Sequence, residues 1–232
     1  MWRAAWQRLS ALLAAIANWR YFKPAVFIAC AIPLGLLAFK FCQLLLWNQA
    51  EALGIDPVKT LEHETGEDAL GVLFATLAVT PIRRIFKINR VQIVRRMLGV
   101  WAFAYAVIHV TIYLVFDRNC YSWAACQFAD VWADILKRKF IFVGMVAFTT
   151  MLLLALTSTS GSVRWLKKNW IRLHRLVYVS AIAGVVHFIW IQKSDISEPM
   201  KWVYGLTLLF AIRVYFWWQK RSGRLLRRPV AT

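Results

Sequence analysis

The sequence predicts an all-α, polytopic membrane protein with six transmembrane helices and with both termini in the cytoplasm. Three observations lead to this fold class. Hydrophobic residues make up 60% of the 232-residue chain, more than a soluble domain of this length carries. Uncharged apolar runs recur at about the 20-residue length that crosses a hydrocarbon core. Basic and acidic residues are segregated between the connections, and this segregation orients the helices.

The six predicted spans are apolar runs separated by polar connections. The second run has 14 residues and is the shortest. Lys40 interrupts the first run, where its ammonium group can reach the interface, and Arg213 interrupts the last. The runs cover residues 24–46, 69–82, 97–116, 140–157, 176–191 and 202–218. The chain then divides into a cytoplasmic or interfacial segment (1–23), a six-helix transmembrane domain (24–218) and a basic cytoplasmic tail (219–232).

Charge segregation sets the predicted orientation. The segment before the first span, the second and fourth connections and the tail contain arginine and lysine but no aspartate or glutamate. All 11 acidic residues fall in the first, third and fifth connections. Because short basic loops stay cytoplasmic, we expect both termini inside and the acidic connections outside. The net charge of +18 is then a signal of topology, and no nucleic-acid partner is expected.

The segment before the first span has its own pattern. Its apolar residues recur at helical spacing with arginines off that line, and no convincing secretory cleavage site follows. This pattern predicts a short helix lying on the inner membrane face, with a frayed leader as the alternative. The apolar positions are Trp2, Trp6, Leu9, Leu13 and Ile16.

The four cysteines fall into two pairs. Cys30 and Cys42 lie within the first span and are predicted to be buried thiols. Cys120 and Cys126 lie in the third connection, which is expected to face outward. An oxidising compartment permits a disulfide there, but spacing alone does not show that the geometry closes.

Several cofactor motifs are absent from the sequence. It contains no CxxCH, so covalent attachment of a c-type haem has no site. No two glycines are spaced as GxG, so a Rossmann fingerprint and a phosphate loop are excluded as well. We expect no soluble nucleotide-binding domain in this chain. Its chemistry must therefore use side chains of the bundle, or a cofactor held there, with a partner supplying electrons or another driving force.

Two histidines lie at matching depth in the third and fifth spans. His109 is 12 residues into the third span and His187 comes 11 residues after Leu176. Both spans run from inside to outside, so at about 1.5 Å per residue both imidazoles lie roughly 17 Å from the inner end. Such a pair can hold haem b by non-covalent bis-histidine ligation. A proton relay or transport site, and a hydrogen bond that only packs two helices, are the alternatives.

A third histidine, His174, lies 13 residues before His187, at the predicted cytoplasmic end of the fifth span. The positions of matching depth on the third span are Arg95 and Arg96. Arginine is a poor iron ligand, but it pairs with a haem propionate or a flavin phosphate. The residues therefore allow one complete metal site and one incomplete site, with His174 as a third candidate metal ligand.

His63 lies at the predicted outer mouth of the second span, where Glu67 and Asp68 favour a helix N-terminus. Three functional interpretations are open: a contact for a quinone, a contact for a docking partner, or a ligand to an incomplete second haem. The alternative is an interfacial polar residue without such a role.

Five motifs between residues 63 and 188 resemble the ferric-reductase-like transmembrane family. They are HETGEDAL, TPIRRI, RRMLGVWAFAYAVIH, LTSTSGSVRWLKKNWIRLHRLVY and VVHF, in this order. Within that family the sequence is most similar to the haem-binding membrane subunits of bacterial periplasmic methionine-sulfoxide reductase systems. Each motif is loose by itself, and their order makes the resemblance specific.

The resemblance implies a function and a set of cofactors. Such a subunit carries electrons from the quinone pool, or from a cytoplasmic flavin reductase, across the inner membrane. It delivers them to a periplasmic molybdenum-cofactor reductase that repairs oxidised methionines. The implied cofactors are haem b, one or two per chain, and FMN. By position, His109 and His187 are the implied haem ligands and His174 a third haem-associated histidine. Two-haem relatives have a histidine where Arg95 or Arg96 stands here.

The sequence as a whole thus predicts a b-type cytochrome of the bacterial inner membrane that serves as an electron-transfer subunit, with the substrate chemistry carried out by a partner. Two alternatives remain open at this point. One is a small proton-coupled transporter that uses His109 and His187 as a relay. The other is a free-standing ferric or quinone reductase of the same fold.

Overall fold

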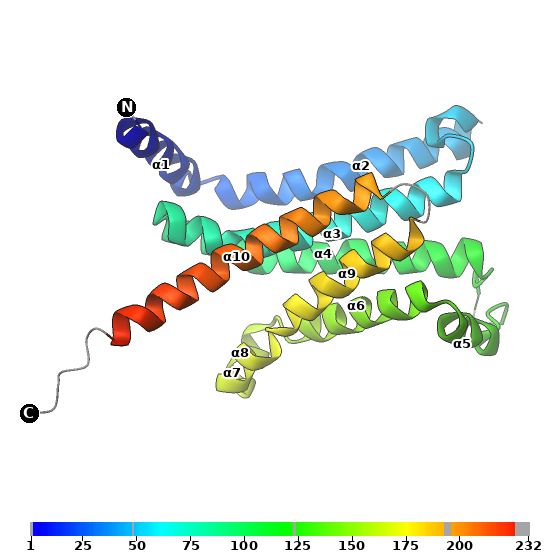
Figure 1. The fold of residues 1–232 in the computed structure, drawn as a ribbon. Helices are drawn as coiled ribbons and strands as arrows, with labels where there is room; N and C mark the ends of the chain where they lie inside the picture. Colours follow the sequence, from blue (N-terminus) through cyan, green and yellow to red (C-terminus); the bar gives the residue numbers. More distant parts are fainter. Residues whose placement is uncertain (1, 48, 123, 193–195, 226–232) are drawn as a thin grey trace, which may run out of the picture.

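The computed structural model describes residues 2–47, 49–122, 124–192 and 196–225, and every regular element within these ranges is a helix (Figure 1). The prediction of an all-α fold is therefore confirmed for the described residues. The short helices η1 (Ala50–Leu53), η2 (Asn89–Val91) and η3 (Tyr113–Asp117) accompany the α-helices. The α-helices are α1 (Trp2–Asn18), α2 (Phe22–Trp47), α3 (Pro57–Phe86), α4 (Gln92–Ile112), α5 (Phe128–Lys137), α6 (Lys139–Leu156), α7 (Ser160–Leu166), α8 (Lys168–Leu173), α9 (Leu176–Ile191) and α10 (Ser197–Leu225).

Five helical segments among the described residues are long and apolar enough to cross a membrane. They correspond to the first five predicted spans, with the fourth ending one residue earlier than predicted, and lie at Phe22–Trp47, Glu51–Phe86, Asn89–Asp117, Lys139–Leu156 and Lys168–Ile191. The sixth predicted span falls inside α10, which has 29 residues and is long enough to cross. Because this helix carries Arg213 and many tryptophans and tyrosines, it is less apolar than the other five. The sixth crossing therefore stays a prediction.

The second span starts earlier than the sequence analysis predicted. α3 runs from Pro57 and is capped by Asp56, whose carboxylate accepts a hydrogen bond of 3.1 Å from the Lys59 backbone N–H. The helix start expected at Glu67 and Asp68 is therefore wrong. Two of the acidic residues of this segment pair with cations of other helices. They are Glu64, which pairs with Lys40 at 2.8 Å, and Glu67, which pairs with Lys201 at 3.0 Å.

The helices alternate in direction, so that the basic connections gather at one end of the bundle. In Figure 1, α1, α7, α8 and the C-terminal end of α10 lie at the left, whereas η1 and α5 lie at the right. The basic segments identified in the sequence belong to the left-hand end and the acidic ones to the right-hand end. Part of the tail predicted at 219–232 continues α10 as far as Leu225, and its remainder lies outside the described residues.

Reporter fusions test which end is cytoplasmic. We expect alkaline phosphatase fused at residues 55, 125 or 196 to be active, because these acidic connections are predicted to lie outside. Green fluorescent protein should fluoresce when fused at residues 88, 168 or 225. The same fusion points with the reporters exchanged are the control. Phosphatase activity at residue 88 or 168 would show that the basic connections lie outside and that the predicted orientation is reversed.

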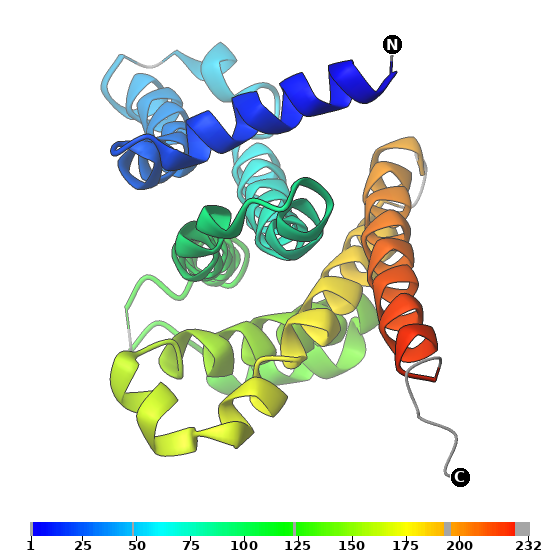
Figure 2. The ribbon, with the colours of Figure 1, turned by 90° about the vertical axis from the view of Figure 1, so that its left-hand side faces the viewer.

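The bundle is built from two closely packed helix pairs. α3 packs along α4, and α6 packs along α9, while α2 and α10 lie at the outside of these pairs (Figure 2). A buried apolar cluster joins α3, α4, α6, α9 and α10, and this core positions the site described below. Its members are Leu70, Leu73, Phe74, Leu77, Ala102, Ala106, Met151, Val177, Ala181, Val185 and Leu206.

An arginine fastens α10 to the bundle. Pro81 stands inside α3 and has no N–H to donate to the carbonyl oxygen of Leu77, four residues earlier. Nη2 of Arg213 supplies the missing donor at 2.5 Å, and Nη1 of Arg213 donates to the Tyr178 hydroxyl of α9 at 2.9 Å. One side chain of α10 therefore connects α3 and α9 through polar contacts in an apolar setting.

The remaining predictions for the cysteines and the N-terminal segment have mixed outcomes. Cys120 and Cys126 form a disulfide with Cα atoms 4.2 Å apart. Cys30 is buried as predicted, but Cys42 is exposed, because α2 lies at the edge of the bundle (Figure 2). The N-terminal segment forms α1 as predicted, and Trp6 stacks on Phe86 of α3 with ring centres 4.9 Å apart.

Candidate functional site

The structure brings His109 of α4 and His187 of α9 together between the two helix pairs. Their ring centres are 6.2 Å apart and their ring planes are perpendicular, at 88°. The matching depth predicted from the sequence is therefore confirmed. Each imidazole is also packed against the partner helix of its own pair, His109 against α3 and His187 against α6.

Backbone carbonyl groups fix the orientation of both rings. Nδ1 of His109 is 2.9 Å from the carbonyl oxygen of Glu62, and Nδ1 of His187 is 2.7 Å from that of Phe140. A carbonyl oxygen only accepts hydrogen bonds, so each Nδ1 carries the proton and donates it. Each Nε2 then has a free lone pair, which is the state in which a histidine binds a metal.

Two glycines leave the space that the imidazoles occupy. A Cβ atom on Gly66 of α3 would lie 3.2 Å from Cε1 of His109, and a Cβ atom on Gly144 of α6 would lie 2.7 Å from Nδ1 of His187. Each glycine comes four residues after the carbonyl group that accepts from the same histidine. The two helix pairs thus hold their histidines by the same device, a carbonyl group at position i and a glycine at position i+4.

The separation of the two rings fits one haem iron held between them. A metal-bound imidazole nitrogen lies about 2 Å from its metal, and the ring centre lies roughly 1 Å beyond that nitrogen. Two rings on opposite sides of one iron therefore have centres about 6 Å apart, close to the 6.2 Å between His109 and His187. Two protein nitrogens are also the number that a bis-histidine haem requires, because the porphyrin supplies the other four.

His174 lies apart from this pair, at the end of α8. Its Nε2 is 3.3 Å from the Thr157 hydroxyl oxygen, and its ring stacks on Trp170 with centres 3.9 Å apart. Arg95 is half-buried and close enough for its charge to act on His174, whereas Arg96 is exposed. The structure therefore brings Arg95, rather than Arg96, toward His174.

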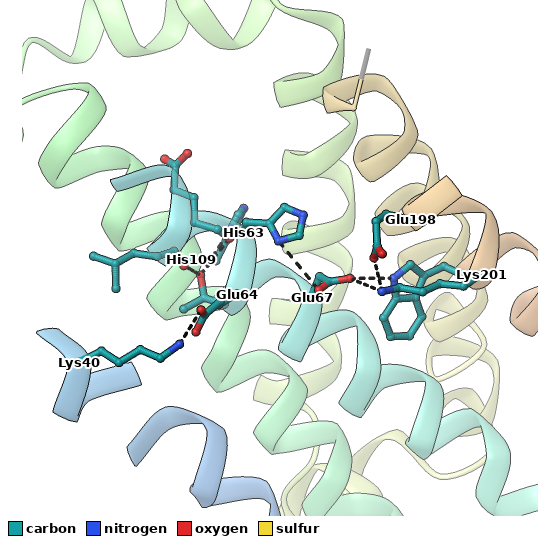
Figure 3. A network of polar contacts seen from close by, with 11 residues as sticks. Lys40, His63, Glu64, Glu67, His109, Glu198 and Lys201 are labelled. Carbon is teal, nitrogen blue, oxygen red and sulfur yellow. Dashed lines mark hydrogen bonds and ion pairs between the residues drawn. The ribbon is translucent and has the colours of Figure 1, made fainter. Parts of the chain in front are cut away.

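His63 lies on the second turn of α3, beside the histidine pair. Its ring meets Phe188, the residue after His187, edge to face at 5.4 Å, and its Nδ1 is 3.9 Å from a carboxylate oxygen of Glu67. Glu67 pairs in turn with Lys201 of α10, which also contacts Glu198. Figure 3 shows this network running from α3 to α10. Nothing in it places the His63 ring against His109 or His187.

A pocket of about 380 Å³ lies between the same α3 segment and α2, and Glu67 lines it as well. The ion pair between Lys40 and Glu64 borders it, as Figure 3 shows for these two side chains. Glu64 and Asp68 flank Thr65 and Gly66 in the α3 segment that contacts His109. Leu36 and Phe39 of α2 are exposed. The lining residues are Pro33, Leu36, Phe39, Lys40, Glu64, Glu67 and Asp68.

The two glycines and the two carbonyl groups were missed by the sequence analysis. Gly66 appears within the motif HETGEDAL and Gly144 within an unremarkable apolar run. A glycine at either place is compatible with many roles, since its neighbours in sequence do not show which helix packs on it. The sequence offered only an indirect signal for these two glycines. An imidazole packed between helices needs space, and a glycine on the adjacent helix provides that space because it has no side chain.

Residues 66–185 match the family model described as "Ferric reductase like transmembrane component". The chain is similar to proteins named "Protein-methionine-sulfoxide reductase heme-binding subunit MsrQ". One from Xanthomonas axonopodis pv. citri is 41% identical over 87% of this chain and 88% of its own length. One from Herminiimonas arsenicoxydans is 40% identical over 86% of this chain and 87% of its own length.

Proposed function

The chain belongs to the MsrQ family of haem-binding subunits, within the wider family of ferric-reductase-like transmembrane components, and on this premise we propose its function. It is a b-type haem subunit that relays electrons across the bacterial inner membrane to a periplasmic methionine-sulfoxide reductase. The observation that carries the proposal is the pair His109 and His187, with ring centres 6.2 Å apart and each Nδ1 on a backbone carbonyl group.

The pair favours electron transfer over catalysis at the metal. A haem held by two histidines supplies a centre that gains and loses one electron at a time. Because His109 and His187 would both be engaged in holding the group, they would favour electron transfer over binding of a substrate to the metal. His109 and His187 hold the group, and the carbonyl groups of Glu62 and Phe140 keep both rings in the tautomer that binds it. A proton relay would instead need at least one nitrogen that exchanges its proton with a neighbour.

The identity of the electron acceptor is inferred from the names of the relatives and not from residues of this chain. Their printed name describes a heme-binding subunit of a protein-methionine-sulfoxide reductase. We propose that the partner is a periplasmic molybdenum-cofactor reductase that reduces methionine sulfoxide in oxidised proteins. The protein described here would act as its electron donor and leave the substrate chemistry to it.

The pocket between α2 and α3 supports a quinol as the electron donor. A lipid-soluble hydroquinone that gives up two electrons also loses two protons, so its site needs proton acceptors beside an apolar wall. Glu64 and Asp68 provide carboxylates, and Pro33, Leu36 and Phe39 provide the apolar wall. A haem held by His109 and His187 would supply the one-electron acceptor for these electrons. The two protons would leave through the carboxylates to the outer side.

Reduction by quinol tests this proposal. The purified protein should show a Soret band that shifts when a short-chain quinol is added, whereas a transporter without haem shows no such band. Glu64→Gln together with Asp68→Asn should slow this reduction by roughly 10-fold to 100-fold, because proton acceptors contribute that much or more. Glu51→Gln is the matched control, since Glu51 is an exposed acid outside the pocket. Dithionite should reduce every variant at the same rate.

A contrary result would assign the donor to the other end of the bundle. If the double variant is reduced by quinol as fast as the parent protein, the pocket is not the quinol site. A cytoplasmic flavin reductase would then be the better candidate. FMN, and a second haem on His174 with Arg95 nearby, belong to this alternative. A haem-to-protein ratio of two would support the second haem.

A further inference from the structure

The Tyr105 hydroxyl group of α4 bonds to two backbone groups of α2. It donates to the Cys30 carbonyl oxygen at 2.7 Å and accepts from the Leu34 N–H at 3.1 Å. These two groups are four residues apart, and a regular α-helix pairs such groups with each other. Tyr105 is only 1% exposed, so water does not compete for its hydroxyl group. A side chain of α4 therefore bridges one step of the hydrogen-bond ladder of α2.

The ladder of α2 is altered at the adjacent step as well. Pro33 stands inside this helix and has no N–H to donate to the carbonyl group of Ala29. Two successive steps of the ladder, from Ala29 to Pro33 and from Cys30 to Leu34, are thus affected. Helices change direction most readily at a proline or where a side chain inserts into the ladder. The direction of the second half of α2 therefore depends on these two steps.

The second half of α2 forms one wall of the pocket of about 380 Å³ between α2 and α3. A buried apolar cluster that includes Cys30 holds α2 before the altered steps, and another that includes Leu37 holds it after them. The bridge from Tyr105 lies between the two clusters. A change in the angle between the two halves would therefore move the pocket wall. The wall residues, all at or after the altered steps, are Pro33, Leu36, Phe39 and Lys40.

We propose that Tyr105 is a positioning residue for this pocket. Its hydroxyl group keeps the bridged step of α2 apart, and the second half of α2 then stands at the distance from α3 that a quinol ring requires. The inference rests on the proposed function, which names quinol as the occupant of the pocket. Tyr105 does not line the pocket, so it acts through α2. In Tyr105→Phe, the Cys30 carbonyl group and the Leu34 N–H would pair with each other, and the wall would move.

Quinol reduction at a series of concentrations tests the functional side of the proposal. In Tyr105→Phe, the concentration of a short-chain quinol that gives half of the maximal rate should rise about threefold to tenfold, which corresponds to the net contribution of one hydrogen bond. The maximal rate, the Soret band and the rate of reduction by dithionite should equal those of the parent protein. Tyr113→Phe is the matched control, because it removes a hydroxyl group that bonds to Asp134 and should leave the half-saturating concentration unchanged.

A distance measurement tests the structural side without quinol. Spin labels attached through Leu45→Cys on α2 and Ile82→Cys on α3, two exposed positions, report where the second half of α2 stands relative to α3. The labels are introduced in a Cys42→Ser background, since Cys42 is an exposed thiol. The distance between the labels, measured by pulsed electron paramagnetic resonance in nanodiscs, should change in Tyr105→Phe and stay the same in Tyr113→Phe.

The two measurements separate failure of this inference from failure of the proposed quinol site. An unchanged label distance in Tyr105→Phe overturns the inference, whatever the quinol kinetics show. An unchanged half-saturating concentration also overturns it if Glu64→Gln together with Asp68→Asn slows reduction, because the pocket is then the quinol site and Tyr105 does not shape it. If that double variant is reduced normally while the label distance changes, the quinol site is wrong and the positioning of α2 by Tyr105 stands.

Discussion

Alanine in place of His109 or His187 is expected to remove the haem from the purified protein almost completely, by about tenfold or more relative to the parent chain. Each histidine is proposed to supply one of two protein ligands, and a haem bound non-covalently would have no other bond to the chain. Loss of metal ligands commonly lowers affinity by at least this factor, since even outer-shell partners cost about 10-fold to 100-fold. The measurement is the haem-to-protein ratio from the Soret band and the protein absorbance.

A matched substitution and a rescue separate ligand loss from misfolding. His174→Ala should keep most of the haem, because His174 lies away from the pair and bonds to Thr157. Imidazole added during expression should restore part of the haem to His187→Ala, because the small molecule replaces the missing ring. If His187→Ala kept its full haem content and a bis-histidine spectrum without added imidazole, the ligand assignment would be wrong.

Gly144→Ala is expected to lower the haem content nearly as much as alanine in place of His187, although Gly144 is not a proposed ligand. The new methyl group would lie 2.7 Å from Nδ1 of His187 and 2.8 Å from its Cε1, closer than non-bonded atoms tolerate. The ring must move, and it then loses its bond to the Phe140 carbonyl group. Overpacking of this kind costs typically about 1–3 kcal/mol. The haem-to-protein ratio and the midpoint potential should therefore both change.

Two other glycine substitutions provide a weaker case and a control for the loss of haem expected in Gly144→Ala. Gly66→Ala should act in the same direction but less strongly, because its methyl group would approach His109 only to 3.2 Å. Gly99→Ala should leave the spectrum unchanged, because its methyl group would come no nearer than 3.9 Å to Thr76 on the adjacent helix. A normal haem content and potential in Gly144→Ala would mean that α6 yields easily and that the glycine does not position the ring.

The sequence was sufficient to predict the helical fold and the proximity of His109 and His187, for a physical reason in each case. Membrane spans need long apolar runs, and such runs are visible without a structure. His109 and His187 were found because rise per residue converts position into depth. The start of α3 was not found, since its acidic residues looked incompatible with a helix near the membrane. Their partners Lys40 and Lys201 come from helices distant in sequence.

The parts that hold the histidines could not be read from the sequence. Depth does not give rotation about the helix axis, so the contacts of His109 with Gly66 and of His187 with Gly144 depend on how whole helices pack. The same limit explains the wrong prediction for Cys42, which lies on the side of α2 that no other helix covers. Whether a residue faces protein or lipid is a property of the assembled bundle.

The contact between Arg213 and the Leu77 carbonyl group has a consequence for the biogenesis of the chain. The predicted crossing of α10 would bring into the bilayer a cation that lipid disfavours, and α3 already contains a carbonyl group that Pro81 leaves without a donor. Each helix therefore carries a defect that only the other repairs. Arg213 also requires Tyr178 of α9, so the last helix is best admitted after α3 and α9 are in place. Insertion of α10 would then complete assembly, and chains that stall before it would keep an unsatisfied polar group that membrane proteases can recognise.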